Sequence, residues 1–237
     1  MNKYEITKKI EDFAPLSLSE KWDCSGWIAE TSKAEINKIL LCLTVTDAII
    51  RQAKLENCDL VISHHPLFKI NCPSELVDKN FHPQIDIYCA HTNMDMTEGG
   101  TTDTLIRVLN LNKTNEDGFV RFVELEKPIK IEDFTTKLAE ISPNLRFTNP
   151  NSSKTVQKIG FCSGSGTEFI DLAIEHGADT FVSGDLKFHT AVDSPIVVFD
   201  IGHFESEIII LDVIKEIIGS NVEIIKAFEE SPLKYRK

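Results

Sequence analysis

The sequence predicts an α/β fold with two lobes, each made of βα units on a mostly parallel sheet. Apolar runs of strand length alternate along the chain with segments of helical periodicity, which is the rhythm of parallel sheets. The length of 237 residues suits either one large α/β unit or two closely packed lobes. With 42% hydrophobic and 26% charged residues, the composition is typical of a folded, soluble protein.

The N-terminal α/β lobe is expected over residues 1–110, and the two lobes are expected to form one compact unit. Apolar residues at helical spacing predict a first helix over 4–13. Three near-continuous apolar runs then have the length of buried strands, at 38–46, 59–63 and 84–90. Helices are expected after the first and the third of these strands, at 47–56 and 102–109.

The C-terminal α/β lobe is expected over residues 111–237. It begins less regularly, with a strand predicted over 119–125 and an amphipathic helix over 131–141. The α/β rhythm then returns, and further strands are expected at 158–163, 178–185, 195–203 and 222–227. Helices are predicted at 168–177 and 204–219.

Charge and composition exclude several classes of partner. The net charge of -12 argues against a protein that grips nucleic-acid phosphates, because that task needs clustered Lys and Arg. No apolar run has the length of a membrane span, and no secretory signal pattern opens the sequence. We therefore expect a cytoplasmic protein with a small-molecule substrate. Six cysteines without a C-x-x-C pair are interpreted as small thiols rather than disulfides: Cys24, Cys42, Cys58, Cys72, Cys89 and Cys162.

Histidines and acidic residues follow the ends of three expected strands. His64 and His65 come directly after the strand at 59–63, and both can reach one site only where the strand has ended, because consecutive side chains of a strand point to opposite faces. Pro66 disfavours continued regular structure at this point. Taken alone, the pair has an ordinary alternative, in which one ring caps the strand and the other is solvated.

The other two strand ends combine an imidazole with a carboxylate. His91 and Asp95 follow the strand at 84–90, although Asn and Asp are also common turn residues there. His203 and Glu207 open the helix after the strand at 195–203, so they lie one helical turn apart and face the same way. A helix-capping role is the alternative for this pair.

Together the three strand ends predict a metal centre, because a parallel sheet gathers ligands beyond the carboxyl ends of its strands. The mixed nitrogen and oxygen donors suit Zn, Fe, Mn, Co or Ni and do not suit calcium. Five ligands exceed what one tetrahedral zinc takes while keeping an open position, so two ions with a bridging carboxylate are expected between the lobes. The predicted metal ligands are His64, His65, Asp95, His203 and Glu207, with Asp95 or Glu207 as the bridge.

The stretches LVISHHPLF, YCAHTNMDMTEGGTTDTL, GFCSGSGTEFIDLAIEHGADTFVSGDLKFH and FDIGHFESE occur in this order. The chain thereby resembles the YbgI-like family of dinuclear-metal proteins, whose members often carry the name GTP cyclohydrolase I type 2. The resemblance runs from about Trp22 to Glu207. It implies a two-lobed protomer, a toroidal homohexamer, a two-metal centre facing the central cavity, and the same five ligands. It also places His91 beside the ligands or facing the substrate.

The sequence departs from the family pattern in two loops. Cys24 stands where the family usually has Asn, and Asp185 and Phe188 stand where it more often has Glu and His. These changes leave the five expected ligands intact. They put in doubt any acid, base or substrate contact from the two loops.

The resulting hypothesis is metal-assisted hydrolysis, in which Glu207 or Asp95 holds a bridging water and His91 passes protons. The resemblance points to GTP, whose imidazole ring would be opened with release of formate. Two alternatives stay open: a non-enzymatic metal-binding, metal-delivery or scaffold ring protein, and a metal-dependent phosphate-ester hydrolase. The GSGT turn at Gly164 and Gly166 fits either a phosphate site or a tight strand-to-helix turn.

Overall fold

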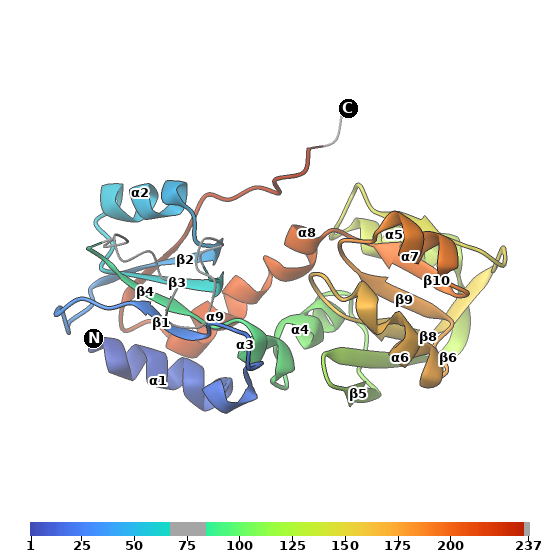
Figure 1. Ribbon diagram of the computed structural model, residues 1–237, viewed down its shortest axis with the longest axis horizontal. Helices are drawn as coiled ribbons and strands as arrows, with labels where there is room; N and C mark the ends of the chain where they lie inside the picture. Colours follow the sequence, from blue (N-terminus) through green and yellow to red (C-terminus); the bar gives the residue numbers. More distant parts are fainter. Residues whose placement is uncertain (67–83, 235–237) are drawn as a thin grey trace. The chain divides into compact units, whose positions relative to one another are not determined.

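The structure is a computed structural model that describes residues 1–66 and 84–234. The chain divides into two units, each shown as a ribbon in Figure 1. The first unit consists of Met1–Gly100 and Ile210–Glu230, and the second consists of Thr101–Ile209 with the residues that follow Glu230. The chain therefore leaves the first unit and returns to it.

The first unit is built on a five-stranded sheet with the order β1-β4-β3-β2-β11. Its strands are β1 (Gly26–Ala29), β2 (Lys38–Thr44), β3 (Leu60–His65), β4 (Asp86–Cys89) and β11 (Glu223–Lys226). β11, β2, β3 and β4 run parallel, whereas β1 pairs antiparallel with β4. Because β3 and β4 run in the same direction, the residues that end or follow them come together at one edge of the sheet.

Helices cover both faces of this sheet, which explains why its central strands are apolar throughout. The helices are α1 (Lys3–Phe13), α2 (Asp47–Leu55), the short α3 (Thr92–Met96) and α9 (Ile210–Ile218), with a 3-10 turn η1 at Leu16–Leu18. α2 packs on one face through Ile49, Ile50 and Ala53. α1 and α9 lie on the opposite face and contact each other (Figure 1).

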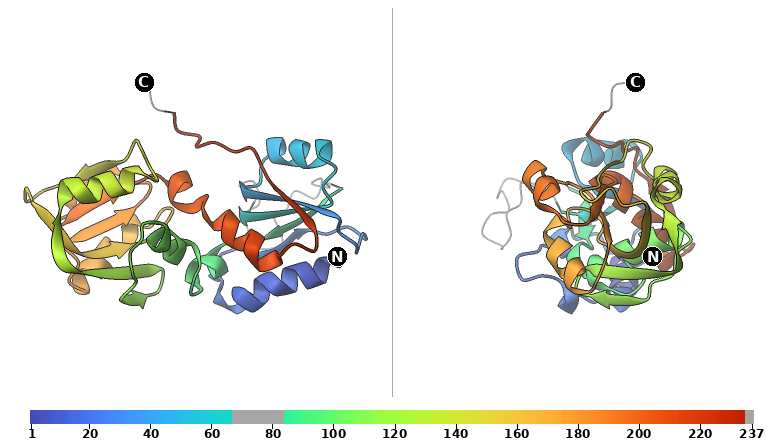
Figure 2. Two further views of the ribbon diagram at one scale, coloured as in Figure 1. Left: turned by 180° about the vertical axis from the view of Figure 1, so that it is seen from behind. Right: turned by 90° about the vertical axis from the view of Figure 1, so that its right-hand side faces the viewer.

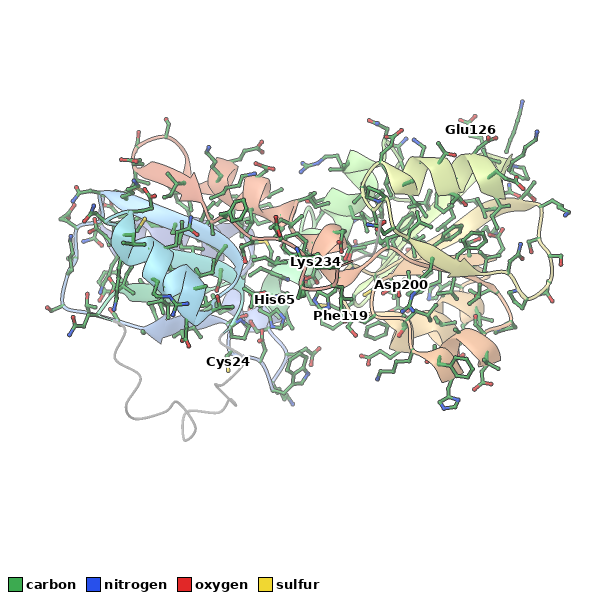
Figure 3. The ribbon with its side chains drawn as sticks, turned by 90° about the horizontal axis from the view of Figure 1, so that it is seen from above. Cys24, His65, Phe119, Glu126, Asp200 and Lys234 are labelled. Atoms are coloured by element: carbon green, nitrogen blue, oxygen red, sulfur yellow. The ribbon has the colours of Figure 1, made fainter. Side chains whose placement is uncertain are left out.

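The second unit is built on a six-stranded mixed sheet with the order β5-β6-β8-β9-β10-β7. Its strands are β5 (Asn115–Asp117), β6 (Val120–Lys130), β7 (Arg146–Thr148), β8 (Thr155–Phe161), β9 (Thr180–Ser183) and β10 (Val197–Asp200). β8, β9 and β10 are parallel, and the strands outside them pair antiparallel. Asp200, labelled in Figure 3, ends β10 just before the segment that carries His203.

Helices also cover both faces of the second sheet, which Figure 2 shows from two further directions. They are α4 (Thr101–Val108), α5 (Ile131–Ala139), α6 (Ile170–Glu175), α7 (Phe188–Asp193) and α8 (His203–Glu207), with a 3-10 turn η2 at Thr167–Phe169. α4 and α5 pack into one apolar core through Leu105, Phe134 and Leu138. α6 packs into the core on the other face through Ile170 and Ala173.

The predicted α/β class is confirmed. Most of the expected strands and helices form within a few residues of their predicted bounds. The helix expected over 204–219 is an exception, because it is two helices, α8 and α9, separated by a turn at Ile208 and Ile209. β-branched side chains crowd the preceding helical turn, which weakens a helix at a run of isoleucines. The boundary between the two units falls in the same place, so α8 and α9 belong to different units.

Four cysteines are buried free thiols, as expected: Cys42, Cys58, Cys89 and Cys162. Cys24 is disulfide-bonded, which corrects the expectation for this residue. Cys72 lies outside the described residues. Among the helices of the described chain, none combines the length and the apolar character that a membrane crossing requires.

Candidate metal centre

Two buried histidines end the central strand of the first unit. β3 extends through His64 and His65, two residues beyond the strand that the sequence predicts, because His65 still pairs with Thr44 of β2. The two side chains are 0% and 6% exposed, and their ring centroids lie 4.8 Å apart. Figure 3 labels His65 at the end of the sheet. The adjacent imidazoles are therefore brought together as expected, although the strand has not yet ended.

A third imidazole joins this pair. His91 follows β4 and immediately precedes α3, and its ring centroid lies 5.2 Å from that of His64 and 5.4 Å from that of His65. One ring nitrogen from each of the three histidines lies within 4.8 Å of the others. His91 is thus part of the cluster itself, whereas the sequence assigned it only a catalytic role beside the ligands.

Asp95 supplies a carboxylate to the same cluster. It lies one helical turn after His91 on the short helix α3, and its Oδ1 is 3.5 Å from His64 Nε2. The first unit therefore carries three imidazoles and a carboxylate within a few ångströms. This donor set suits a divalent first-row ion.

The three imidazoles are each held through Nδ1. His64 Nδ1 lies 2.9 Å from the backbone oxygen of Ala90, and His65 Nδ1 lies 2.8 Å from Thr44 Oγ1. His91 Nδ1 lies 2.7 Å from Asp23 Oδ1. Metal-binding histidines in proteins are oriented in this way, with one nitrogen on a protein acceptor and the other left for the ion. The arrangement makes Nε2 the ring atom that could bind an ion.

Asp23 is a functional residue that the sequence did not identify. It follows Trp22 in the loop before β1, and its side chain is 1% exposed. Burial by itself would raise the pKa of the carboxyl group, but hydrogen bonds from His91, Thr92 and Ser25 outweigh it and hold the pKa well below its usual range. The WDCSG segment was the available signal, but a loop aspartate has no periodicity that would show its partner.

The second unit carries an imidazole and a carboxylate on one short helix. His203 begins α8 and Glu207 ends it, and His203 Nε2 lies 3.0 Å from Glu207 Oε2. Glu207 is 4% exposed. The other ring nitrogen, His203 Nδ1, lies 2.7 Å from Asp185 Oδ2. The predicted i, i+4 pair therefore forms, and its histidine is oriented through Nδ1 like those of the first unit.

This histidine lies between two carboxylates, which changes its acidity. Burial lowers the pKa of His203, but hydrogen bonds and charge interactions with Asp185 and Glu207 outweigh that effect and raise the pKa to about 10. The hydrogen bond from His203 in turn lowers the pKa of Asp185. A site with this much negative charge around one imidazole favours a bound cation.

The GSGT turn packs against the His203–Glu207 pair. Gly164 has a φ of 65°, and a Cβ at this position would overlap Glu207 Oε1. The N–H groups of Gly164 and Gly166 donate to the hydroxyls of Ser206 and Ser183. These donors are already used inside the protein, which favours the tight-turn interpretation of the glycines over a phosphate site. The absence of a side chain at Gly164 lets the Glu207 carboxylate lie against the turn.

The positions that depart from the family pattern behave differently. Asp185 contacts a predicted ligand directly, through His203 Nδ1. Phe188 is 76% exposed at the start of α7.

The first unit supplies His64, His65, His91 and Asp95 as donors, and the second supplies His203 and Glu207. Both donor sets combine imidazoles with carboxylates, a mixture that suits a divalent first-row metal ion.

Known proteins resemble this chain along most of its length. A GTP cyclohydrolase 1 type 2 homolog from Clostridium perfringens is 32% identical over 252 residues, covering 95% of this chain and 95% of the relative. A protein of the same name from Clostridium acetobutylicum is 30% identical over 226 residues, covering 86% of this chain and 84% of the relative.

Solved structures show the same fold. Reduced HcgD from Methanocaldococcus jannaschii superposes with a TM-score of 0.81 at 27% identity, covering 95% of this chain and 97% of that one. The Staphylococcus aureus hypothetical protein SA1388 superposes with a TM-score of 0.83 at 20% identity, covering 100% and 99%. Protein ybgI, described as of unknown function, has a TM-score of 0.86 at 20% identity, covering 98% and 100%.

A family model also matches nearly the whole chain. The matched residues are 1–232, and the model is that of Duf34/NIF3 (NGG1p interacting factor 3). The match includes both donor sets, and it agrees with the YbgI-like resemblance that the motifs indicate. The chain belongs to the Duf34/NIF3 family.

Proposed function

We propose that the chain is a divalent-metal-dependent hydrolase with a two-metal centre, and that its metal ligands are His64, His65, Asp95, His203 and Glu207, the set that the family resemblance implies. One observation carries this proposal. Each histidine in the set is held through Nδ1 by a partner outside the set, so Nε2 is the ligand atom in every case. Metal-binding histidines are commonly oriented in this way, by a hydrogen bond from the ring nitrogen that does not bind the ion.

Glu207 is the residue that we propose as the bridge between two ions. Its side chain is 5% exposed, whereas that of Asp95 is 17% exposed, and its carboxylate lies against the backbone of Gly164. A carboxylate with one oxygen toward each ion can serve two sites at once. Bound divalent ions would supply Lewis acidity and would lower the pKa of a coordinated water toward neutrality.

His91 is the proton-transfer residue in this proposal. Its Nδ1 is bound to Asp23, and its ring lies beside those of His64 and His65. An imidazole in this position can accept a proton at Nε2 from the attacking water and return it to the leaving group.

The substrate class that we propose is a purine nucleotide, with GTP as the first candidate. The names of the curated relatives support this choice. Trp22 supports it as well: its side chain is 64% exposed, and its ring centroid lies 6.2 Å from that of His91 in an edge-to-face arrangement. An exposed indole offers a stacking surface for a planar base. Hydrolysis would open the imidazole ring of the base and release formate.

The assembly that we propose is a homohexamer, on the basis of the family resemblance. Native mass spectrometry of the purified chain tests it directly. A mass near six chains supports the proposal, and a monomer at micromolar concentration overturns it.

The proposed activity is tested by measuring formate released from GTP by the purified, metal-loaded protein. We expect turnover that depends on added divalent ions and is lost in His64→Ala and Glu207→Ala. Asp171→Asn, which changes an exposed residue of α6, is the control and should retain full activity. Phosphate release from a phosphomonoester such as GMP, with no formate released from GTP, would replace the proposal with phosphate-ester hydrolysis. Stoichiometric metal without turnover of any nucleotide would replace it with a metal-delivery role.

A further inference from the structure

Asp23 occupies a site built to hold a carboxylate anion. Its Oδ2 accepts hydrogen bonds from Ser25 Oγ at 2.7 Å, from the backbone N–H of Thr92 at 3.0 Å and from Thr92 Oγ1 at 2.5 Å. Its Oδ1 accepts from the backbone N–H of Cys24 at 2.6 Å and contacts His91 Nδ1 at 2.7 Å. Donors from two separate loops thus surround one carboxylate.

These contacts determine where His91 carries its proton. An ionised carboxylate can only accept hydrogen bonds, so the 2.7 Å contact requires a proton on His91 Nδ1. In a neutral imidazole with the proton on Nδ1, Nε2 carries the lone pair. The lone pair is therefore on the nitrogen that Asp23 does not contact, and this is the nitrogen left for the cluster of His64 and His65.

The ring of His91 is also fixed from outside the cluster. The backbone N–H of His91 donates to Ser25 Oγ at 3.1 Å, and the hydroxyl of Ser25 donates to Asp23. The aspartate, the serine and the histidine therefore form one hydrogen-bonded group around the start of α3. Such a group holds the ring in one orientation without contacting the cluster itself.

We propose that Asp23 is a positioning residue that fixes His91 in the tautomer with the proton on Nδ1 and the lone pair on Nε2. Its use in catalysis rests on the proposed hydrolase function, in which His91 Nε2 accepts a proton. The tautomer itself does not depend on that function. An asparagine at position 23 would offer an N–H to His91 Nδ1 and would thereby select the opposite tautomer.

The tautomer can be measured directly in the metal-free protein. We would label histidines with ¹⁵N, remove metal with a chelator, and record long-range ¹H–¹⁵N correlations at a pH where the His91 signal is that of a neutral ring. A His91→Gln variant identifies the signal. We expect protonated Nδ1 and unprotonated Nε2 in the wild-type protein, and the reverse in Asp23→Asn. A wild-type His91 with its proton on Nε2 overturns the proposal, even if Asp23→Asn fails to fold.

A matched control separates positioning from general damage to the loop. Ser25→Ala removes one donor to Asp23 but keeps the carboxylate, so the wild-type tautomer should persist. If His91 keeps the wild-type tautomer in Asp23→Asn, the positioning role of Asp23 is contradicted.

Kinetics then separate this inference from the proposed function. For Asp23→Asn we expect bound metal to be retained, KM to change little, and kcat for formate release to fall by roughly two to four powers of ten. A kcat equal to that of the wild type would overturn the catalytic use of Asp23. If the wild-type protein releases no formate while the tautomers are as expected, the proposed function fails and the positioning role of Asp23 stands.

Discussion

His203 Nδ1 lies 2.7 Å from Asp185 Oδ2, although Asp185 lies in the loop after β9 and His203 begins α8, which follows β10. The same ring faces Glu207 through Nε2 at 3.0 Å. Because β9 and β10 are adjacent parallel strands, the residues after their carboxyl ends meet at one edge of the sheet. The aspartate orients the imidazole, and the imidazole presents its second nitrogen beside a buried carboxylate.

Replacing Asp185 should weaken metal binding without unfolding the protein. Asp185 has a φ of 54°, a conformation that Asn also adopts readily, so Asp185→Asn keeps the backbone and removes the anionic acceptor. We expect metal affinity to fall by about 10- to 100-fold, as for other residues that orient a metal-binding histidine. Competition with a chromophoric chelator measures this. Asp171→Asn is the control, and equal affinities in the two variants would contradict the orienting role of Asp185.

Gly164 should be needed for a reason beyond its backbone conformation. Gly164→Ala and Gly177→Ala both place a side chain at positive φ, 65° and 78°, which costs about 1–2 kcal/mol. At Gly177 a Cβ meets no atom within 4 Å, whereas at Gly164 it overlaps Glu207.

Both variants should therefore lose similar stability in urea unfolding, while only Gly164→Ala should lose metal affinity, by about tenfold or more. Loss of metal affinity in Gly177→Ala to the same degree would show that backbone strain alone explains the effect.

The sequence located these histidines and carboxylates because the ends of strands can be recognised from the local pattern of apolar and polar residues. Apolar runs located β3, β4 and β10, and the polar residues after them had to meet at sheet edges. The i, i+4 spacing of His203 and Glu207 predicted their shared helix face in the same way. These inferences need only periodicity and the direction of neighbouring strands.

The residues that orient the histidines could not be predicted, because their contacts are set by packing between distant segments. Asp23 and His91 are 68 positions apart, and Thr44 and His65 are 21 apart. No pattern in either segment identifies the other. The pairing of β11 with β2 is a similar case, since a strand near residue 225 pairs with one near residue 40. The disulfide at Cys24 was missed for the same reason.

Trp22 should affect nucleotide binding more than chemistry. If the exposed indole stacks on the base, Trp22→Ala should raise KM for GTP by about tenfold, since base–aromatic stacking contributes roughly 1–3 kcal/mol. We expect kcat to change little. Trp22→Phe keeps an aromatic face and should restore part of the affinity. An unchanged KM in Trp22→Ala would remove the stacking role.

Glu229 should make stability depend on pH in a specific direction. Its carboxylate accepts from the backbone N–H groups of Leu43 and Thr44, but burial outweighs these bonds and raises its pKa. A carboxyl group with a raised folded-state pKa contributes stability below its unfolded pKa and loses that contribution as pH rises through the folded pKa.

Glu229→Gln cannot ionise, so its unfolding free energy relative to the wild type should increase between about pH 4 and about pH 7. Urea unfolding across this range measures the difference, and Glu98→Gln, an exposed position in the same unit, is the control. A relative stability that decreases with pH would mean that the two hydrogen bonds outweigh burial.

The most direct test is the amount of metal bound per chain, measured by elemental analysis of protein purified without a metal-binding tag. The wild-type protein should bind about two equivalents of a divalent first-row ion. His64→Ala and His203→Ala should each bind less, because both residues belong to the proposed ligand set. Absence of stoichiometric metal in the wild-type protein, or full metal content in both variants, would contradict the proposed centre.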